Sequence, residues 1–329
     1  MFQTQINHFL QSFESKGLTF FMQLITSLGN ELILIIILIT IISGINFRKG
    51  FLLIQIVIIT GLLTQIAKHF FALPRPWFVD SGLTAFNKKL VTDFSYMDSK
   101  SFFGYLPQNV IDSYRLLKPD SFGFPSGHTS SAVALWASVI VLFRKKFVII
   151  TSISFLILIP VSRLYLARHF LADILAGYFL GFFVLLVFYF AILKLSVITS
   201  YLKANKIRFA LTFKSAYQLF YLLVLPVIFL FVVPDKYSTL SGYLIGINIA
   251  FLAIGLKQFP IYSSSIFHGV YRVLITLIVF VLIGFIVTFC YKYLFFSSLF
   301  WGDFFVGAFI TSTGTLLSTK LIRYVKLSS

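Results

Sequence analysis

Long apolar runs, separated by short polar stretches, occupy the chain from about residue 18 almost to its end. Several runs exceed eighteen residues, the length at which an apolar helix can cross a lipid bilayer. Because unpaired backbone groups are costly in lipid, such runs must be helical. The pattern predicts an all-α, polytopic helical membrane protein. The predicted spans lie at residues 18–43, 51–71, 127–143, 147–165, 170–193, 215–233, 240–256, 268–290 and 297–318.

Two regions near the N-terminus have a mixed pattern. Residues 2–14 alternate Phe, Ile and Leu with Gln and Asn at helical spacing, which predicts a helix in the membrane interface; a loosely packed, flexible end is the alternative. The first predicted span contains Gly29, Asn30 and Glu31, which indicates a short interfacial helix that runs into a span.

We expect three consecutive segments along the chain. Residues 1–17 form the interfacial segment, residues 18–194 a membrane domain, and residues 195–329 an extension of about four spans without recognisable chemistry. The loop at 72–126 is the long polar segment, and loops of this length usually bind ligands or cover sites, or are simply mobile. GxxxG spacings at 177–181 and 242–246 permit close helix contact, although such spacings are frequent by chance.

Composition supports the membrane assignment. Of 329 residues, 59% are hydrophobic and 11% charged, and the mean hydropathy of +0.96 excludes an ordinary soluble domain. Cys290 lies in an apolar run and has no second cysteine with which to form an internal disulfide. The chain begins without a basic region followed by a short apolar core, so we expect no cleaved signal peptide.

The net charge of +17 could indicate a nucleic-acid partner, but its distribution follows the membrane topology instead. One set of loops receives fifteen basic residues and no acidic residue: Arg48, Lys49, Arg144, Lys145, Lys146, Lys194, Lys203, Lys206, Arg208, Lys214, Lys257, Arg272, Lys320, Arg323 and Lys326. The opposite set carries Asp80, Asp93, Asp98, Asp112, Asp120 and Asp235. The bias predicts that the basic face is cytoplasmic, with the N-terminus outside and the C-terminus inside.

The stretch 162–173 concentrates chemistry at the outer boundary, with two arginines, a histidine and an aspartate. Charges at a membrane boundary are costly and usually functional. His169 and Asp173 are four residues apart and share one face of a helix. A carboxylate can hold one imidazole nitrogen as N–H and leave the other with a free lone pair. The pair therefore indicates a nucleophile or a base.

Two further segments return to the same boundary, at 68–76 and 124–129. Lys68, Arg75 and Arg163 are three cations at one membrane depth, and such a group of positive charges requires an anionic partner. Acidic residues of the outer loop could be this partner, but a phosphate matches the planar, forked guanidinium group of arginine better. The turn at Ser126-Gly127 leaves backbone N–H groups free at a helix N-terminus, and glycine allows an oxyanion to approach.

Each of these residues also has a purely structural interpretation. Lys68 could extend its amine to the headgroups, Ser126 could cap a helix, and a lone His128 in a first turn is more often structural than catalytic. Arg163 and Arg168 could anchor the chain to lipid phosphates, and for Arg168 we keep that interpretation. Taken together, the cations, the cradle and the two histidines favour a phosphate site with a nucleophile and a general acid.

Three motifs, in this order, resemble the signatures of the type 2 phosphatidic acid phosphatase superfamily. They are Lys-x6-Arg-Pro at 68–76, Pro-Ser-Gly-His at 125–128 and Ser-Arg-x5-His-x3-Asp at 162–173. The resemblance covers about residues 18–194 and no motif position departs from it. Each motif alone is moderate support, and three in register are strong.

The resemblance implies a role for each matching position. His169 would attack phosphorus and form a phosphohistidine, with Asp173 holding its far nitrogen, and His128 would protonate the leaving oxygen and later activate water. Lys68, Arg75, Ser126, Gly127 and Arg163 would bind the phosphoryl oxygens. Members of the family work without metal or another cofactor, which agrees with the lack of a carboxylate cluster or His/Cys ligand spacing on the outer face.

The expected function is hydrolysis of a lipid mono- or diphosphate at the outer face of a cytoplasmic membrane. Phosphatidic acid, phosphatidylglycerol phosphate and undecaprenyl diphosphate are the substrate types that the resemblance implies. A phosphotransferase of the same superfamily and a non-enzymatic lipid transporter or scramblase remain alternatives; a soluble vanadate haloperoxidase disagrees with nine apolar spans. The expected partners are membrane lipids and not nucleic acid, and the sequence does not determine the oligomeric state.

Overall fold

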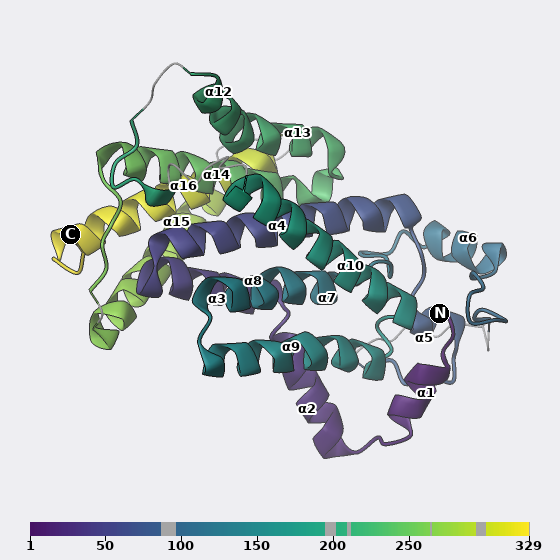
Figure 1. Ribbon diagram of the computed structural model, residues 1–329. Helices are drawn as coiled ribbons and strands as arrows, with labels where there is room; N and C mark the ends of the chain where they lie inside the picture. Colours follow the sequence, from purple (N-terminus) through teal and green to yellow (C-terminus); the bar gives the residue numbers. More distant parts are fainter. Residues whose placement is uncertain (87–96, 195–201, 209–211, 264, 294–300, 329) are drawn as a thin grey trace. The chain divides into compact units, whose positions relative to one another are not determined.

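The computed structural model describes residues 1–86, 97–194, 202–208, 212–263, 265–293 and 301–328 (Figure 1). Within these ranges the chain is helical, with only an isolated antiparallel bridge between Tyr262 and Ser328. The α-helices are α1 (Gln5–Gln11), α2 (Lys16–Ser27), α3 (Glu31–Ile39), α4 (Phe47–Phe71), α5 (Pro76–Val79), α6 (Gln108–Leu116), α7 (Gly127–Ala132), α8 (Ser138–Phe143), α9 (Lys146–Tyr165), α10 (Leu171–Phe188), α12 (Phe213–Leu219), α13 (Leu225–Val232), α14 (Ser238–Lys257), α15 (Ile266–Tyr293) and α16 (Gly302–Tyr324). Short π and 3₁₀ turns are η1 (Thr40–Ile45), η2 (Val133–Ala137), η3 (Tyr189–Lys194), η4 (Phe220–Val224) and η5 (Asp235–Tyr237).

The all-α, polytopic membrane architecture predicted from the hydropathy pattern is confirmed. In the described ranges, seven helical segments are long and apolar enough to cross a membrane. The pair α2 and α3–η1 qualifies as an eighth but is bent by 54°, and the helix at Gly127–Phe143 is a shorter apolar one. Each of the nine predicted spans thus corresponds to an apolar helical segment, but only seven or eight of these qualify as spans, and the count of nine crossings stays a prediction. The start of the last predicted span at residue 297 lies outside the described residues, as does Asp93 of the outer loop.

The chain forms two compact units that are discontinuous in sequence. One contains Met1–Leu34 and Leu63–Leu185, and the other contains Ile35–Leu62 and Leu186–Ser329. Every predicted site residue falls in the first unit. This division differs from the three consecutive segments expected above, because residues 35–62 cluster with the C-terminal part; the functional boundaries at 17 and 194 stay predictions.

Both GxxxG stretches mark close helix contacts. A Cβ added at Gly177 of α10 would lie 2.8 Å from the carbonyl oxygen of Ser126, and one at Gly181 would lie 2.6 Å from Cβ of Val133. In the second unit, a Cβ at Gly242 would lie 2.1 Å from the carbonyl oxygen of Phe304 on α16. The glycines of α10 therefore let this helix pack against the backbone of the turn that carries Ser126.

The N-terminal segment is packed against the first unit. Phe2 belongs to a buried cluster with Trp77 of α5 and Phe170, and Figure 1 places the N-terminus at the same end of the unit as α5 and α6. The Asn7 side chain of α1 has no exposed surface, and its Nδ2 donates to the carbonyl oxygens of Leu164 (2.7 Å) and His169 (3.2 Å). The alternative interpretation of the N-terminal segment, a loosely packed and flexible end, is therefore wrong.

The opposite side of this segment remains exposed and apolar. Phe9 is 63% and Phe13 59% exposed, and their rings meet edge to face with centroids 5.3 Å apart. An amphipathic helix with one aromatic face outward is the pattern expected in the membrane interface. A helix is present at Gln5–Gln11, and Asn7 on its polar face contacts the segment that carries His169; its location in the membrane interface stays a prediction.

Replacing Asn7 with alanine removes both hydrogen bonds and leaves two buried carbonyls without this donor. We expect a loss of about 1–3 kcal/mol in the free energy of unfolding. The measurement is thermal unfolding of the purified protein in detergent, with Gln5→Ala on the exposed side of the same helix as the control. Equal melting temperatures for the two variants would contradict a structural role for the Asn7 amide.

Candidate active site

The first motif places two cations beside the segment that precedes α7. Lys68, in the last turn of α4, is only 4% exposed, and its amine donates to the carbonyl oxygens of Phe122 and Gly123. Arg75 immediately precedes α5 and donates from Nη2 to the carbonyl oxygen of Phe122 (3.3 Å). Both side chains therefore converge on the turn at residues 122–123, and neutral carbonyls are their partners there.

The second motif forms the helix start expected from the sequence, with Ser126 as the N-cap and Gly127 as the first residue of α7, and its use as a phosphate cradle stays a prediction. The N–H of Ser126 donates to the carbonyl oxygen of Asp173 (2.9 Å), and the Ser126 hydroxyl caps the helix by accepting from the N–H of Thr129 (3.4 Å). Between them, the N–H groups of Gly127 and His128 have no acceptor within the described residues. A Cβ added at Gly127 would lie 3.7 Å from Cε of Lys68, so the free N–H groups and the Lys68 amine border the same space.

The third motif lies across the end of α9 and the start of α10. Helix α9 ends with the N–H of Arg168 bonded to the carbonyl oxygen of Arg163 (3.0 Å) and that of Ala167 to Leu164 (3.1 Å). This is the Schellman arrangement, with Ala167 in the left-handed conformation (φ 52°) where glycine is usual. Five residues, 166–170, connect α9 to α10, so His169 lies in this connection and Asp173 in the first turn of α10.

His169 and Asp173 form the dyad that their spacing predicts. Nδ1 of His169 lies 3.1 Å from Oδ2 of Asp173, which also accepts the N–H of Phe170 (3.0 Å). His169 is 1% exposed and Asp173 has no exposed surface. Because the carboxylate accepts from Nδ1–H, it leaves the lone pair on Nε2. Burial, followed by the positive charges of Arg75, Arg163, Lys68 and His128, holds the pKa of His169 well below its usual range.

Arg163 reaches the site from the last turn of α9. Its Nη1 donates to the hydroxyl of Thr26 on α2 (2.8 Å), and Nε is buried with no partner in the described part of the chain. Arg168 differs, because its guanidinium donates to the carbonyl oxygen of Phe86. Its own carbonyl oxygen accepts from Nη1 of Arg75 (3.2 Å). The structure thus gives Arg168 a supporting place beside the motif, and its expected contact with lipid phosphate stays a prediction.

Among the described residues, no carboxylate forms an ion pair with Lys68, Arg75 or Arg163. The ion pairs recorded among the described residues are His8 with Asp80, Arg115 with Asp112, and His169 with Asp173. Asp98, a further acid of the outer loop, accepts from the N–H of Thr4 (2.8 Å). Three cations, an unused guanidinium donor and two free backbone N–H groups are the donors that an anion with several oxygens requires, and its binding here stays a prediction.

Two residues of the site were not assigned from the sequence. Oδ1 of Asn30 lies 3.1 Å from Nε2 of His128, and a Cβ added at Gly29 would lie 2.7 Å from Cδ2 of the same ring. The interrupted apolar run at 29–31 was the available signal, because polar residues within a span are usually functional. Its partner could not be identified, since 98 residues separate Asn30 from His128.

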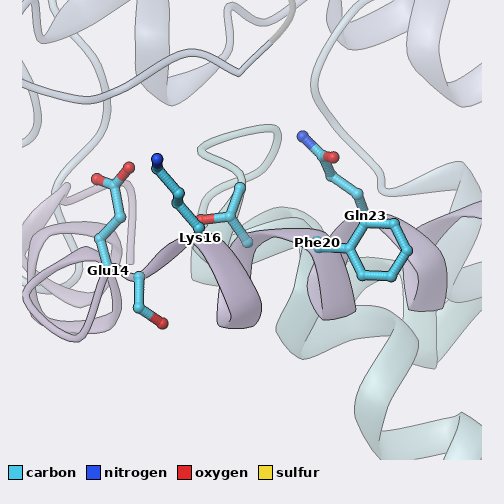
Figure 2. A pocket seen from close by; sticks show the side chains of 6 residues that line it. Glu14, Lys16, Phe20 and Gln23 are labelled. Atoms are coloured by element: carbon cyan, nitrogen blue, oxygen red, sulfur yellow. The ribbon is translucent and has the colours of Figure 1, made fainter.

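A hollow on the surface of the first unit lies away from these residues. It is lined by Glu14, Ser15, Lys16, Thr19, Phe20 and Gln23. Figure 2 shows Lys16, Phe20 and Gln23 along the first turns of α2, with Glu14 in the preceding turn. None of the predicted site residues lines this open depression, so we do not assign the chemistry to it. In the described ranges no three His, Cys, Asp or Glu side chains are grouped to hold a metal, and metal independence stays a prediction.

Comparison with known proteins agrees with this geometry. The model of the PAP2 superfamily matches residues 49–197. Phosphatidylglycerophosphatase B of Bacillus subtilis (strain 168) is 29% identical over 141 residues, which cover 38% of this chain and 68% of that protein. Lipid A 4'-phosphatase of Bacteroides thetaiotaomicron is 37% identical over 75 residues, which cover 23% of this chain and 33% of that protein.

No solved structure matches the chain. The family match contains Lys68, Arg75, the Pro-Ser-Gly-His stretch and the His169–Asp173 dyad, and it leaves the N-terminal segment and most of the second unit unmatched. The seven apolar helices establish a multi-pass membrane protein. Residues 49–197, the segment that holds all three motifs, are therefore similar to the PAP2 superfamily.

Proposed function

We propose that this protein is an integral membrane lipid phosphatase that works through a phosphohistidine. The observation that carries the proposal is the buried His169–Asp173 dyad, adjacent to cations that have no carboxylate partner in the described part of the chain. A transporter that merely binds headgroups needs the cations but not a histidine whose lone pair a buried carboxylate directs. The names of the two relatives, both phosphatases, support the same activity.

The first half of the proposed reaction transfers the phosphoryl group. Nε2 of His169 attacks phosphorus while the bond from phosphorus to the leaving oxygen breaks, and His128 gives its proton to that oxygen. Lys68, Arg75 and Arg163, with the N–H groups of Gly127 and His128, hold the three equatorial oxygens in the transition state. Asp173 stabilises the positive charge that develops on the imidazole.

The second half regenerates the enzyme. His128, now neutral, takes a proton from water as the water oxygen attacks the phosphohistidine, and the P–N bond breaks to release inorganic phosphate and neutral His169. The same histidine thus serves as acid and then as base, as microscopic reversibility requires.

The substrate we propose is a lipid mono- or diphosphate. The apolar spans surrounding the motifs allow an acyl or prenyl tail to enter laterally from the bilayer while the phosphate occupies the cradle. Phosphatidic acid, phosphatidylglycerol phosphate and undecaprenyl diphosphate are the candidate types. From the Lys/Arg bias, we place the site on the outer face of a cytoplasmic membrane and the C-terminus in the cytoplasm.

A panel of these lipid phosphates in detergent and in liposomes tests the proposal. Purified protein should release inorganic phosphate from at least one of them, and EDTA should leave the rate within about twofold of the untreated enzyme, because histidines and not a metal perform the steps above. Complete loss in EDTA would contradict the metal-independent mechanism. Labelled phosphate recovered on a second lipid, instead of as free phosphate, would identify a transferase.

A further inference from the structure

The break between α2 and α3 lies against two of the site residues. Helix α2 ends at Ser27 and α3 begins at Glu31, with their axes bent by 54°. Before the break, Thr26 accepts from Arg163; at its end, the amide of Asn30 lies 3.1 Å from Nε2 of His128. This part of the chain precedes the segment that matches the family, at residues 49–197.

The contact with His128 involves one defined edge of its ring. Cδ2 and Nε2 are bonded neighbours in imidazole, and the first meets Gly29 while the second meets Asn30. A Cβ added at Gly29 would lie 2.7 Å from Cδ2 and 3.3 Å from Cγ, closer than side chains tolerate. The glycine therefore lets the backbone of the break approach the ring of His128. The side-chain amide of the next residue, Asn30, forms a hydrogen bond with the same ring. Nδ1, on the other edge, has no hydrogen-bond partner among the described residues.

Building on the proposed phosphatase function, we propose that Asn30 is the positioning residue of His128. Its Oδ1 accepts from Nε2–H and fixes the ring, so that Nδ1 exchanges the proton during the reaction. In the first half, the proton on Nδ1 of the imidazolium moves to the leaving oxygen, and the neutral ring keeps its proton on Nε2. In the second half, Nδ1 takes a proton from the attacking water.

The two histidines of the site then differ in the charge of their partners. Asp173, a carboxylate, bonds His169 and supports the positive charge that the nucleophile acquires. Asn30, a neutral amide, bonds His128 and orients it without favouring the imidazolium as a carboxylate would. A general acid donates its proton to the leaving oxygen more readily when its hydrogen-bond partner is neutral, because a carboxylate would stabilise the protonated ring.

Leaving groups of different basicity test this role. A lipid alkoxide needs a proton to depart, whereas p-nitrophenolate departs without one. We expect Asn30→Ala to lower kcat/KM about 10–100-fold for a lipid phosphate and less than about threefold for p-nitrophenyl phosphate. Gly29→Ala, which displaces the ring without removing the amide, should show the same selectivity. Asn109→Ala on α6, the same substitution at an exposed position, should match the wild type on both substrates.

A double-mutant cycle separates positioning from a general effect on the fold. In the His128→Ala background, adding Asn30→Ala should lower kcat/KM no further, because the residue on which Asn30 acts is gone. An additive loss in the double variant, an equal loss for both substrates, or a wild-type rate in Asn30→Ala would overturn the inference. If His128→Ala itself retains the wild-type rate, the proposed phosphatase mechanism is wrong, and that result is distinct from a failure of Asn30→Ala alone.

Discussion

Alanine in place of His169 reduces phosphate release from a lipid phosphate by about 10⁴-fold or more, the largest effect we expect from any single substitution. In the proposed mechanism the imidazole is the nucleophile, and among the residues that the structure describes no other side chain near the cradle has a lone pair directed by a buried carboxylate. In the proposed site the cations that remain should still bind the phosphate. The KM should therefore change little while kcat falls, and steady-state release of inorganic phosphate measures both.

Trapping the intermediate makes this prediction specific to the nucleophile. Wild-type protein quenched in base during turnover of a ³²P-labelled substrate should retain label, which acid then releases, as expected of a P–N bond. His169→Ala should retain none. His268→Ala, which removes an exposed histidine of the second unit, should label like the wild type. Normal labelling of the His169→Ala protein would mean that another residue is the nucleophile.

The sequence was sufficient to predict the parts of this site that depend on local spacing. His169 and Asp173 are one helical turn apart, so their contact follows from the helix itself, and Ser126 followed by Gly127 could be recognised as a helix start. All three motifs lie at the ends of predicted spans. Because helices that cross one bilayer have their ends at common depths, the sequence also predicted that the motifs converge. The bond from Ser126 N–H to the Asp173 carbonyl confirms this convergence of the second and third motifs.

The remaining contacts could not be predicted, because they join positions far apart in sequence. Asn7 and His169 are separated by 162 residues, Thr26 and Arg163 by 137. Polar residues in an amphipathic N-terminal segment look alike whether they face water or a neighbouring loop. Likewise, the spacing of Gly177 and Gly181 is common by chance, and only the close approach to Ser126 shows that it positions the cradle.

The dyad can also be tested without removing its histidine. Asp173→Asn preserves the shape of the side chain. Oδ2 contacts both the N–H of Phe170 and Nδ1 of His169, so an amide turned with its nitrogen toward Nδ1 also loses the bond from Phe170. The substitution removes the negative charge that stabilises the developing phosphoimidazolium, and the amide N–H can donate to Nδ1, which places the proton on Nε2 and removes the attacking lone pair. We expect kcat to fall about 10²–10⁴-fold, with Asp112→Asn in the exposed pair with Arg115 as the matched control.

The pH dependence distinguishes this tautomer effect from a change in protonation. In the wild type, burial and then the charges of Arg75 and Arg163 hold the pKa of His169 well below its usual range, so the ring is already neutral at pH 6.5 and above. Removing a nearby negative charge moves the pKa lower, not higher. Neutral imidazole therefore persists in Asp173→Asn, and raising the pH from about 6.5 to about 8.5 should recover none of the lost kcat relative to wild type. Recovery at high pH would instead mean that Asp173 acts by keeping His169 unprotonated.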